Sequence, residues 1–187
     1  MDSLITLLKS DANTANAFGA LASAATAILA LFVSVLSVWI SISSARNQRR
    51  HNELSVRPLA EVTVADYEDS LRVKLRNNGS GPMIVQKVKV INGSKAYESL
   101  IECMPPLPKE RPWNAFSHAL SLRSLQAGAE ITLLELTEYE AEHEFVICRD
   151  EVRAALAPLT VSVEFTDIYG TVMQPYQKPL SWFGRNL

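Results

Sequence analysis

The chain contains 187 residues, with 18 Lys and Arg against 20 Asp and Glu and a formal net charge of −2 at pH 7. Residues from Arg46 onward carry 17 of these cations and 18 of these anions, so they lack the surplus of clustered positive charge that nucleic-acid binding needs. The two cysteines, Cys103 and Cys148, do not form a Cys-x-x-Cys motif, which argues against a disulfide scaffold, a zinc site and thiol redox chemistry.

The N-terminal part of the chain contains an uncharged apolar run over residues 18–42. With a rise of ~1.5 Å per residue, a helix of that length measures about 37 Å and exceeds the ~30 Å hydrocarbon core of a bilayer. The cations Arg46, Arg49 and Arg50 follow the run. We therefore predict a short N-terminal segment over residues 1–17, a transmembrane helix over residues 18–44 and a basic juxtamembrane stalk over residues 45–57.

The arginines after the run predict the orientation of this helix. Lys9 is the one Lys or Arg before the run, so the positive-inside rule places the N-terminus outside and the residues after Ser44 in the cytoplasm. Arg46, Arg49 and Arg50 then serve topology and attraction to anionic lipid. A secretory signal peptide is the alternative, since Ser43-Ser44-Ala45 resembles a cleavage site, but the apolar run is about twice as long as the usual h-region.

Small residues recur within the predicted helix at alternating steps of three and four residues. This spacing places them on one side of the helix, at heptad positions a and d. Small side chains let membrane helices approach closely, and hydroxyl groups can form hydrogen bonds across the contact. We therefore predict self-association of the helix; a serine-lined pore in a larger ring and a simple effect of Ala/Ser-rich composition are the alternatives. The predicted contact residues are Ala20, Ser23, Ala27, Ala30, Ser34, Ser37, Ser41 and Ser44.

After the stalk, the periodicity of apolar residues becomes two, which is typical of half-buried β-strands. It predicts strands over residues 60–64, 71–76 and 83–91. Turns are predicted at residues 77–82 and 92–94, because their Asn, Gly and Pro residues accept positive φ or lack an amide donor. If the second and third strands pair, their cations meet as an anion-binding patch, although a solvated sheet face is the simpler interpretation. Those cations are Arg72, Lys74, Arg76, Lys87 and Lys89.

The C-terminal half repeats this pattern. It predicts strands over residues 131–136, 159–166 and 171–177, with a short helix over residues 148–157. Residues 104–128 contain four prolines and form a long irregular connection, which makes them a candidate binding segment. Six or seven strands without a helix between each predict a mainly β fold, an immunoglobulin-like antiparallel β-sandwich over residues 58–187.

Residues capable of catalysis or metal binding do not form a recognisable motif. One acidic stretch contains Glu138, Glu140, Glu142, His143 and Glu144, whereas tetrahedral zinc needs ligand pairs from two separate sites. His51 and His118 have no Gly-x-Ser-x-Gly nucleophile motif beside them, and the chain has no glycine-rich phosphate loop. We therefore predict no catalytic residue, no metal and no cofactor.

Four short segments carry a resemblance to other proteins. They are Ser55-Val56-Arg57-Pro58, Asn77-Asn78-Gly79-Ser80-Gly81-Pro82, Leu125-Gln126-Ala127-Gly128 and Phe165-Thr166-Asp167-Ile168-Tyr169-Gly170. In this order after one N-terminal span, they resemble a broad group of uncharacterised bacterial inner-membrane proteins. The resemblance implies a bacterial source and a single-pass inner-membrane protein with a cytosolic β-sandwich. In layout alone, the chain is also similar to small membrane effectors of bacterial anti-phage defence systems.

These observations lead to one expected function and two alternatives. We expect a non-enzymatic membrane-anchored interaction or sensor module, whose cytosolic domain binds a protein or small signal while its helix self-associates in the lipid bilayer. The first alternative is a membrane-perturbing defence effector that is triggered through the β domain. The second is a hydrolase or other enzyme that uses the acidic stretch, with His143 as its best candidate residue.

Overall fold

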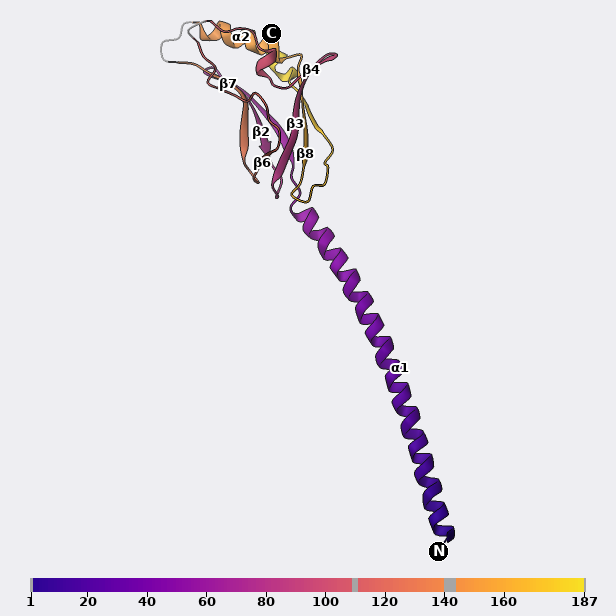
Figure 1. Cartoon of the computed structure of the whole chain (residues 1–187). Coiled ribbons are helices and arrows are strands. Elements are labelled where there is room, and N and C mark those ends of the chain that lie inside the picture. Colours follow the sequence, from indigo (N-terminus) through magenta and orange to yellow (C-terminus); the bar gives the residue numbers. More distant parts are fainter. Residues whose placement is uncertain (1, 109–110, 140–143, 187) are drawn as a thin grey trace. The chain divides into compact units, whose positions relative to one another are not determined.

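The computed structural model describes residues 2–108, 111–139 and 144–186 (Figure 1). The chain divides into two compact units, Met1–Asn52 and Glu53–Leu187. The first unit is helical and belongs to helix α1 (Asp2–Ser55), whose last three residues fall in the second unit. The second unit contains all the strands together with helix α2 (Phe145–Leu156) and the 3-10 helices η1 (Ile101–Cys103) and η2 (Ser181–Asn186).

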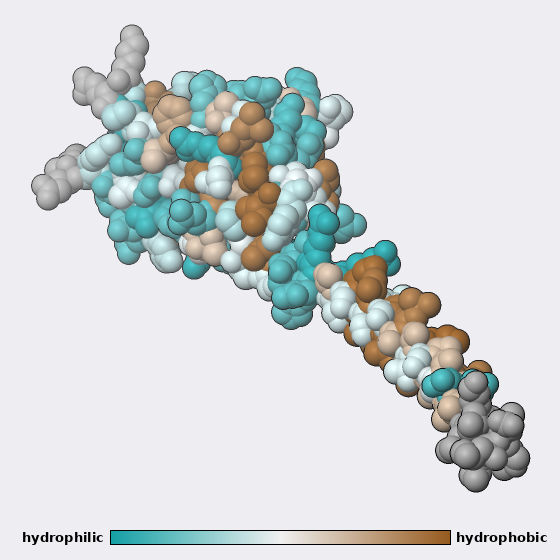
Figure 2. Space-filling view, turned by 60° about the horizontal axis from the view of Figure 1, so that its bottom comes forward, coloured by the Kyte–Doolittle hydropathy of each residue, from teal (hydrophilic) through white to brown (hydrophobic). Residues whose placement is uncertain are grey.

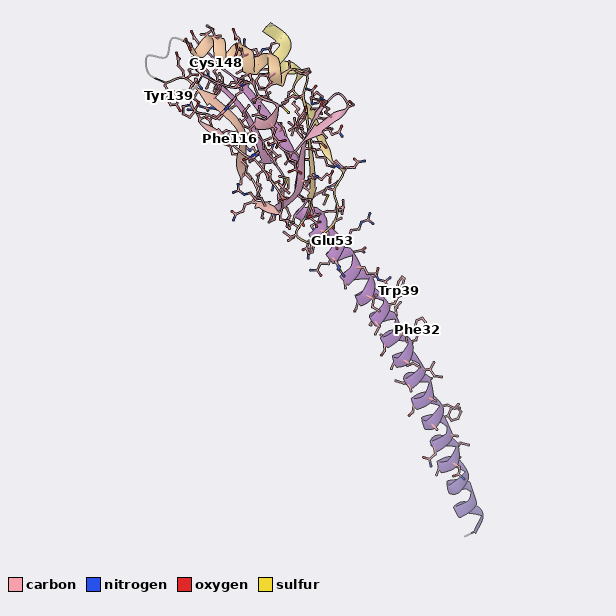
Figure 3. The ribbon with its side chains drawn as sticks, turned by 45° about the horizontal axis from the view of Figure 1, so that its top comes forward. Phe32, Trp39, Glu53, Phe116, Tyr139 and Cys148 are labelled. Atoms are coloured by element: carbon pink, nitrogen blue, oxygen red, sulfur yellow. The ribbon has the colours of Figure 1, made fainter. Side chains whose placement is uncertain are left out.

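Helix α1 is long because its sequence contains no proline and only one glycine, Gly19. Its part from Asp11 to Ser55 contains a stretch long and apolar enough to cross a membrane, and none of that stretch is buried. Brown, hydrophobic side chains alternate with paler ones along the helix in Figure 2, and Phe32 and Trp39 project from it in Figure 3. Membrane spans and signal sequences both have these properties. The helix ends at Ser55 because Pro58 disfavours helical geometry in the residue before it.

The strands of the second unit form two antiparallel sheets. The first sheet has the order β1-β2-β7-β5, and the second has the order β4-β3-β8-β9, with β6 also paired to β3. Both sheets contribute to one hydrophobic core, which gives a β-sandwich-like domain. The strands are β1 (Ala60–Asp66), β2 (Ser70–Asn77), β3 (Met83–Asn92), β4 (Lys95–Tyr97), β5 (Ala115–Phe116), β6 (Arg123–Leu125), β7 (Glu130–Thr137), β8 (Thr160–Thr166) and β9 (Tyr176–Pro179).

The alternation in the sequence produces the core directly. In β2, Leu71, Val73 and Leu75 are fully buried, and the intervening cations point outward. Each buried aliphatic side chain stabilises the fold by roughly 1.5–3 kcal/mol relative to exposure. The outward cations pair across strands with glutamates. Lys74 lies 2.6 Å from Glu130 and Arg72 lies 2.9 Å from Glu135.

Several predicted elements differ from the observed ones. The strand expected over residues 171–177 is wrong in position, since β9 begins only at Tyr176. Within the predicted range, Val172 forms an isolated antiparallel bridge with Thr166, and the continuous ladder with β8 starts only after Pro175, which has no amide donor. Helix α2 begins at Phe145, three residues before the predicted start. The connection over residues 104–128 contains the short strands β5 and β6, and β4 was not predicted.

The two ends of the sandwich differ in which segments meet there. We call one end the base. It contains the start of β1 and the loops over residues 77–82, 126–129 and 167–175. These segments meet because Ala60 pairs with Asn77, the N–H of Asn77 donates to the carbonyl of Ala129, and Ile84 pairs with Thr166. The opposite end, called the far end, contains residues 66–69 and helix α2, joined through Asp66 and Arg153. Figure 1 shows α2 at that end of the strands.

A buried ionic network holds the far end together. The Asp66 side chain is 2% exposed and accepts two hydrogen bonds from Arg153, at 3.0 and 3.1 Å. Arg185 of η2 approaches the same carboxylate at 3.2 Å, and Asp150 lies 2.9 Å from Arg153. The network therefore fastens α2 and η2 to the end of β1.

Replacing Asp66 with Ala should destabilise the domain by about 3–5 kcal/mol, because Arg153 would remain buried without its main carboxylate. Urea unfolding of the full chain in detergent micelles measures this change. Glu68→Ala removes an exposed carboxylate two residues away and serves as the control, with an expected change within about 0.5 kcal/mol. Equal effects of the two substitutions would contradict the structural role of the network.

Candidate functional site

The eight small residues predicted as a helix–helix contact all lie on α1 and are exposed, from Ala20 to Ser44. Bulky residues such as Leu31, Phe32 and Trp39 are exposed on the same helix. Arg46, Arg49 and Arg50 follow on the next turns and are also exposed. The structure holds one copy of the chain, so the contact stays a prediction.

Three serines of this set bond to the backbone of their own helix. The hydroxyl groups of Ser34, Ser37 and Ser41 each donate to the carbonyl four residues earlier, at 2.8 Å. Such bonds satisfy a hydroxyl donor inside lipid without any partner helix. The serine oxygens keep their acceptor capacity, and their small size still permits close approach of another helix.

The side chain of Asn77 is completely buried at the base and forms hydrogen bonds with several backbone groups. Its amide oxygen accepts from the backbone N–H groups of Leu59 at 3.2 Å and Gly79 at 3.0 Å. Its amide nitrogen donates to the carbonyls of Gly81 at 2.8 Å and Leu125 at 3.1 Å. One side chain therefore ties together the start of β1, the connection from β2 to β3 and the turn before β7.

Two glycines let the chain that follows α1 lie against this connection. A Cβ atom at Gly81 would overlap the carbonyl of Val56, and one at Gly79 would overlap backbone atoms of Arg57 and Leu59. Ser80 adds hydrogen bonds from its hydroxyl to the carbonyl of Ser55, at 2.5 Å, and from its N–H to the carbonyl of Arg57, at 3.2 Å. Residues 55–59 are thus fixed to the sandwich by direct backbone contacts.

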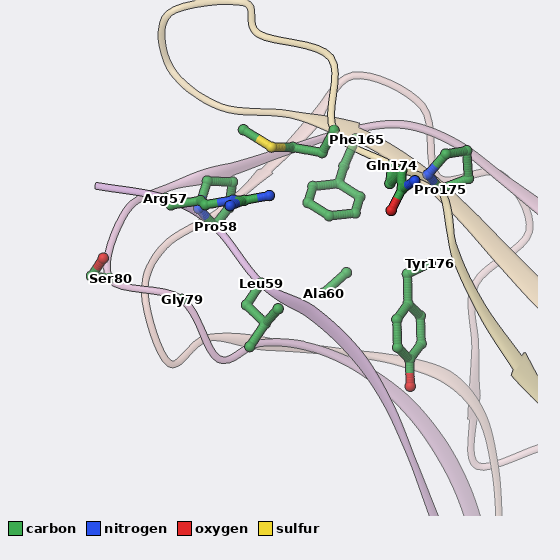
Figure 4. Close-up of a pocket in the computed structure, with 11 residues that line it drawn as sticks. Arg57, Pro58, Leu59, Ala60, Gly79, Ser80, Phe165, Gln174, Pro175 and Tyr176 are labelled. Carbon is green, nitrogen blue, oxygen red and sulfur yellow. The ribbon is translucent and has the colours of Figure 1, made fainter. Parts of the chain in front are cut away.

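A cleft of about 610 Å³ opens beside this junction, between the first residues of β1 and the segment that leads into β9 (Figure 4). Figure 4 shows Arg57 and Tyr176 at opposite sides of the cleft, with Phe165 between them. The lining residues are Arg57, Pro58, Leu59, Ala60, Gly79, Ser80, Phe165, Met173, Gln174, Pro175 and Tyr176. This volume lies within the range of small-ligand sites, which is roughly 300–1,000 Å³.

The chemistry of the cleft favours an amphipathic or anionic small molecule. Its lining is largely aliphatic and aromatic, and it includes one cation, Arg57, but no carboxylate. An apolar lining with a few polar groups is typical of binding sites, in which the polar groups orient the ligand. The sequence predicted a binding segment at residues 104–128 and not this cleft. The lining comes from four separate segments, residues 57–60, 79–80, 165 and 173–176, so no local pattern marks it.

Ser99, Glu102 and His118 form a second polar cluster, near η1. The Ser99 hydroxyl donates to Glu102 at 2.7 Å and lies 3.3 Å from Nδ1 of His118. In a catalytic triad the histidine stands between the serine and the carboxylate, whereas here the serine occupies the middle. Burial raises the pKa of the neighbouring Cys103 thiol, and the charge of Glu102 raises it further. A raised pKa makes a thiol a weaker nucleophile at neutral pH.

Among the described residues, no group of three or more His, Cys, Asp or Glu side chains is placed to hold a metal ion. Glu140, Glu142 and His143 of the acidic stretch lie outside the described residues. Cys148 is buried in α2, and Cys103 is partly buried.

The cations of β2 and β3 do not form the predicted anion-binding patch, because these two strands belong to different sheets.

Replacing Asn77 with Ala should destabilise the β domain by at least about 2 kcal/mol, because several buried backbone groups lose their partners. Thermal and urea unfolding of the full chain in detergent measure the change. The neighbouring Asn78 is exposed, and its side-chain amide donates a hydrogen bond to the carboxylate of Glu61. Asn78→Ala is therefore the matched control, with an expected change within about 0.5 kcal/mol.

Comparison with known proteins assigns no relative to this chain. No protein-family model, no curated protein and no solved structure matches it.

Proposed function

We propose that this protein is a non-enzymatic, membrane-anchored interaction or sensor module. In this proposal α1 crosses the bacterial inner membrane once, self-associates through its small residues and leaves the β domain in the cytoplasm. The cleft at the base of that domain binds the signal or the partner segment. The observation that carries the proposal is an unburied apolar helix followed by a compact domain whose cleft adjoins the residues that leave the helix.

The junction supports a sensing role. Residues 55–59 line one wall of the cleft and are also fixed by Asn77 and Ser80. A ligand in the cleft would touch the chain that connects the domain to α1. Occupancy of the cleft can therefore bias the arrangement of the helices, provided that the ligand binds one arrangement more tightly than another.

We also infer that the domain is of the immunoglobulin-like type. The orders β1-β2-β7-β5 and β4-β3-β8-β9 correspond to the strand orders A-B-E-D and C′-C-F-G of that fold. In such domains, the loops at the ends of the sandwich commonly carry the binding residues. The base cleft lies among these loops.

The topology is tested by reporters fused after Leu187. Because Arg46, Arg49 and Arg50 follow the apolar run, a fluorescent reporter that folds in the cytoplasm should be active, and a periplasmic phosphatase reporter should be inactive. Carbonate extraction should leave the full chain in the membrane fraction. Phosphatase activity with a soluble, shortened chain would instead identify residues 1–45 as a cleaved signal sequence.

Self-association is tested by enlarging two of the small residues. Ala27→Leu combined with Ser34→Leu should reduce the signal of a bacterial membrane two-hybrid assay to background, because bulky side chains prevent close helix approach. Ala25→Leu combined with Ser43→Leu makes the same chemical changes on other sides of α1 and should leave the signal unchanged. An unchanged two-hybrid signal for both double variants would contradict the predicted helix–helix contact.

Expression of the wild-type chain separates the proposed module from a membrane-perturbing effector. A sensor module should leave the membrane potential and growth unchanged, whereas an effector should depolarise the membrane. Depolarisation that disappears with the Ala27 and Ser34 pair would favour the effector function.

A further inference from the structure

The cleft at the base lies between the edge strands of the two sheets. Strand β1 is at the edge of the first sheet, and β9 is at the edge of the second. Figure 4 shows Leu59 and Ala60, at the start of β1, facing Pro175 and Tyr176 at the start of β9. An edge strand turns half of its backbone N–H and C=O groups away from its own sheet, so it can pair with an added strand.

The hydrogen bonds between β1 and β2 show which backbone groups of β1 face away from the first sheet. The carbonyl of Leu59 accepts from the N–H of Asn78 at 2.8 Å, so the backbone groups of Leu59 face the β2 side. Consecutive residues of an antiparallel strand turn their backbone groups to opposite edges. The N–H and C=O of Ala60 therefore face away from β2, on the side of the cleft that Ala60 lines.

These two groups of Ala60 have neither a protein partner nor free access to water. Ala60 is 2% exposed. Its register partner Asn77 bonds instead to Ala129 at 3.0 Å and to Gly128 at 2.8 Å. Within the described part of the chain, no hydrogen bond joins the N–H or C=O of Ala60 to another residue. More than about 90% of buried backbone groups are paired, so this donor and acceptor beside a cleft indicate a ligand that supplies both.

The β9 wall of the cleft does not offer the same backbone groups. The N–H of Leu180 donates to the carbonyl of Leu159 at 2.8 Å. By the same alternation, Pro175, Gln177 and Pro179 turn their backbone groups to the free edge of β9. The two prolines have no N–H, and proline at an edge protects a strand from pairing. An added strand would therefore pair with β1 and contact only side chains on the β9 wall.

The charge of the lining indicates a further property of the ligand. Arg57 is its one cation, and the lining contains no carboxylate. The Arg57 side chain is exposed, and none of the described residues forms an ion pair with it. Glu61 of β1 is not part of the lining and accepts a hydrogen bond from Asn78 instead. A carboxylate on the ligand would form a charge-assisted hydrogen bond with the guanidinium group.

We propose that the cleft binds an extended acidic peptide as a strand added to β1. The peptide backbone bonds to the N–H and C=O of Ala60, its apolar side chains pack on Phe165 and Tyr176, and its Glu or Asp side chain pairs with Arg57. Such binding takes its affinity from main-chain hydrogen bonds and its specificity from alternate side chains. The volume of about 610 Å³ suits a short segment. This inference rests on the proposed function, in which the cleft binds a partner segment, and defines the chemistry of that segment.

The test selects peptides against the full chain in lipid nanodiscs. A phage-displayed library of random short peptides is first depleted on nanodiscs without the chain and then panned on nanodiscs with it. Co-elution of the chain with the nanodisc lipid reports separately whether α1 is inserted. The affinity of an enriched peptide, synthesised with a fluorophore, is then measured by fluorescence anisotropy.

We expect the enriched peptides to be acidic and to bind through their backbone. N-methylation of one alternating set of peptide amides should weaken binding at least about tenfold, because that set faces β1, whereas N-methylation of the other set should have a much smaller effect. Arg57→Gln should weaken binding at least about tenfold, because the carboxylate loses its charged donor. Arg123→Gln is the matched control, because Arg123 is an exposed cation of β6 outside the cleft.

Two proline substitutions test the edge of β1 itself. Ala60→Pro removes an N–H that the ladder with β2 does not use, so it should weaken peptide binding at least about tenfold. Val64→Pro removes an N–H from the same edge of β1 beyond the cleft and should change the affinity by less than about twofold. Circular dichroism checks that each variant is folded, and the N-methylated peptides test the same bonds on the unaltered chain.

The other outcomes separate this inference from the proposed function. If no peptide is enriched, or if both N-methylated sets bind equally well, strand addition is overturned while the inserted module remains. Enriched peptides without Glu or Asp overturn the pairing with Arg57. A chain that binds acidic peptides but does not co-elute with nanodisc lipid supports the peptide site and overturns the proposed membrane span.

Discussion

The buried amide of Asn77 is the interaction on which the organisation of the base depends. Its oxygen and nitrogen together join the start of β1, the connection over residues 77–82 and the turn before β7. An apolar residue could fill the same space, but it would leave these backbone groups without partners inside the protein. The polar centre thus fixes where the chain leaving α1 meets the sandwich, and that meeting point forms one wall of the cleft.

Different interactions hold the two ends of the domain together. At the far end, Asp66 and Arg153 join α2 to β1 through a buried ion pair, and exposed carboxylates surround the turn over residues 66–69. At the base, backbone contacts made possible by Gly79 and Gly81 replace ionic ones, and the loops carry no exposed carboxylate. The two ends of the domain are therefore held by different kinds of contact, an ion pair at one end and close backbone packing at the other.

The proposed activities share one structural requirement, which is that events at the base reach α1. The cleft is lined by Arg57 and Pro58, which follow the last residue of the helix within three positions, so a ligand bound there would contact the segment that leaves α1.

The sequence alone determined the features that depend on local periodicity. The apolar run over residues 18–42 predicted the exposed helix, and the alternation in Leu71, Val73 and Leu75 predicted both a strand and its buried face. The two-residue periodicity placed the last strand too early, at residue 171, and missed the short strands within residues 104–128, which pair with β7 and β3. The tertiary structure decided that β2 and β3 belong to different sheets, which separates their cations, and that Arg57, Phe165 and Tyr176 border one cleft. These arrangements arise from contacts between residues far apart in the chain. Such contacts produce no local periodicity in the sequence, so they cannot be predicted from it.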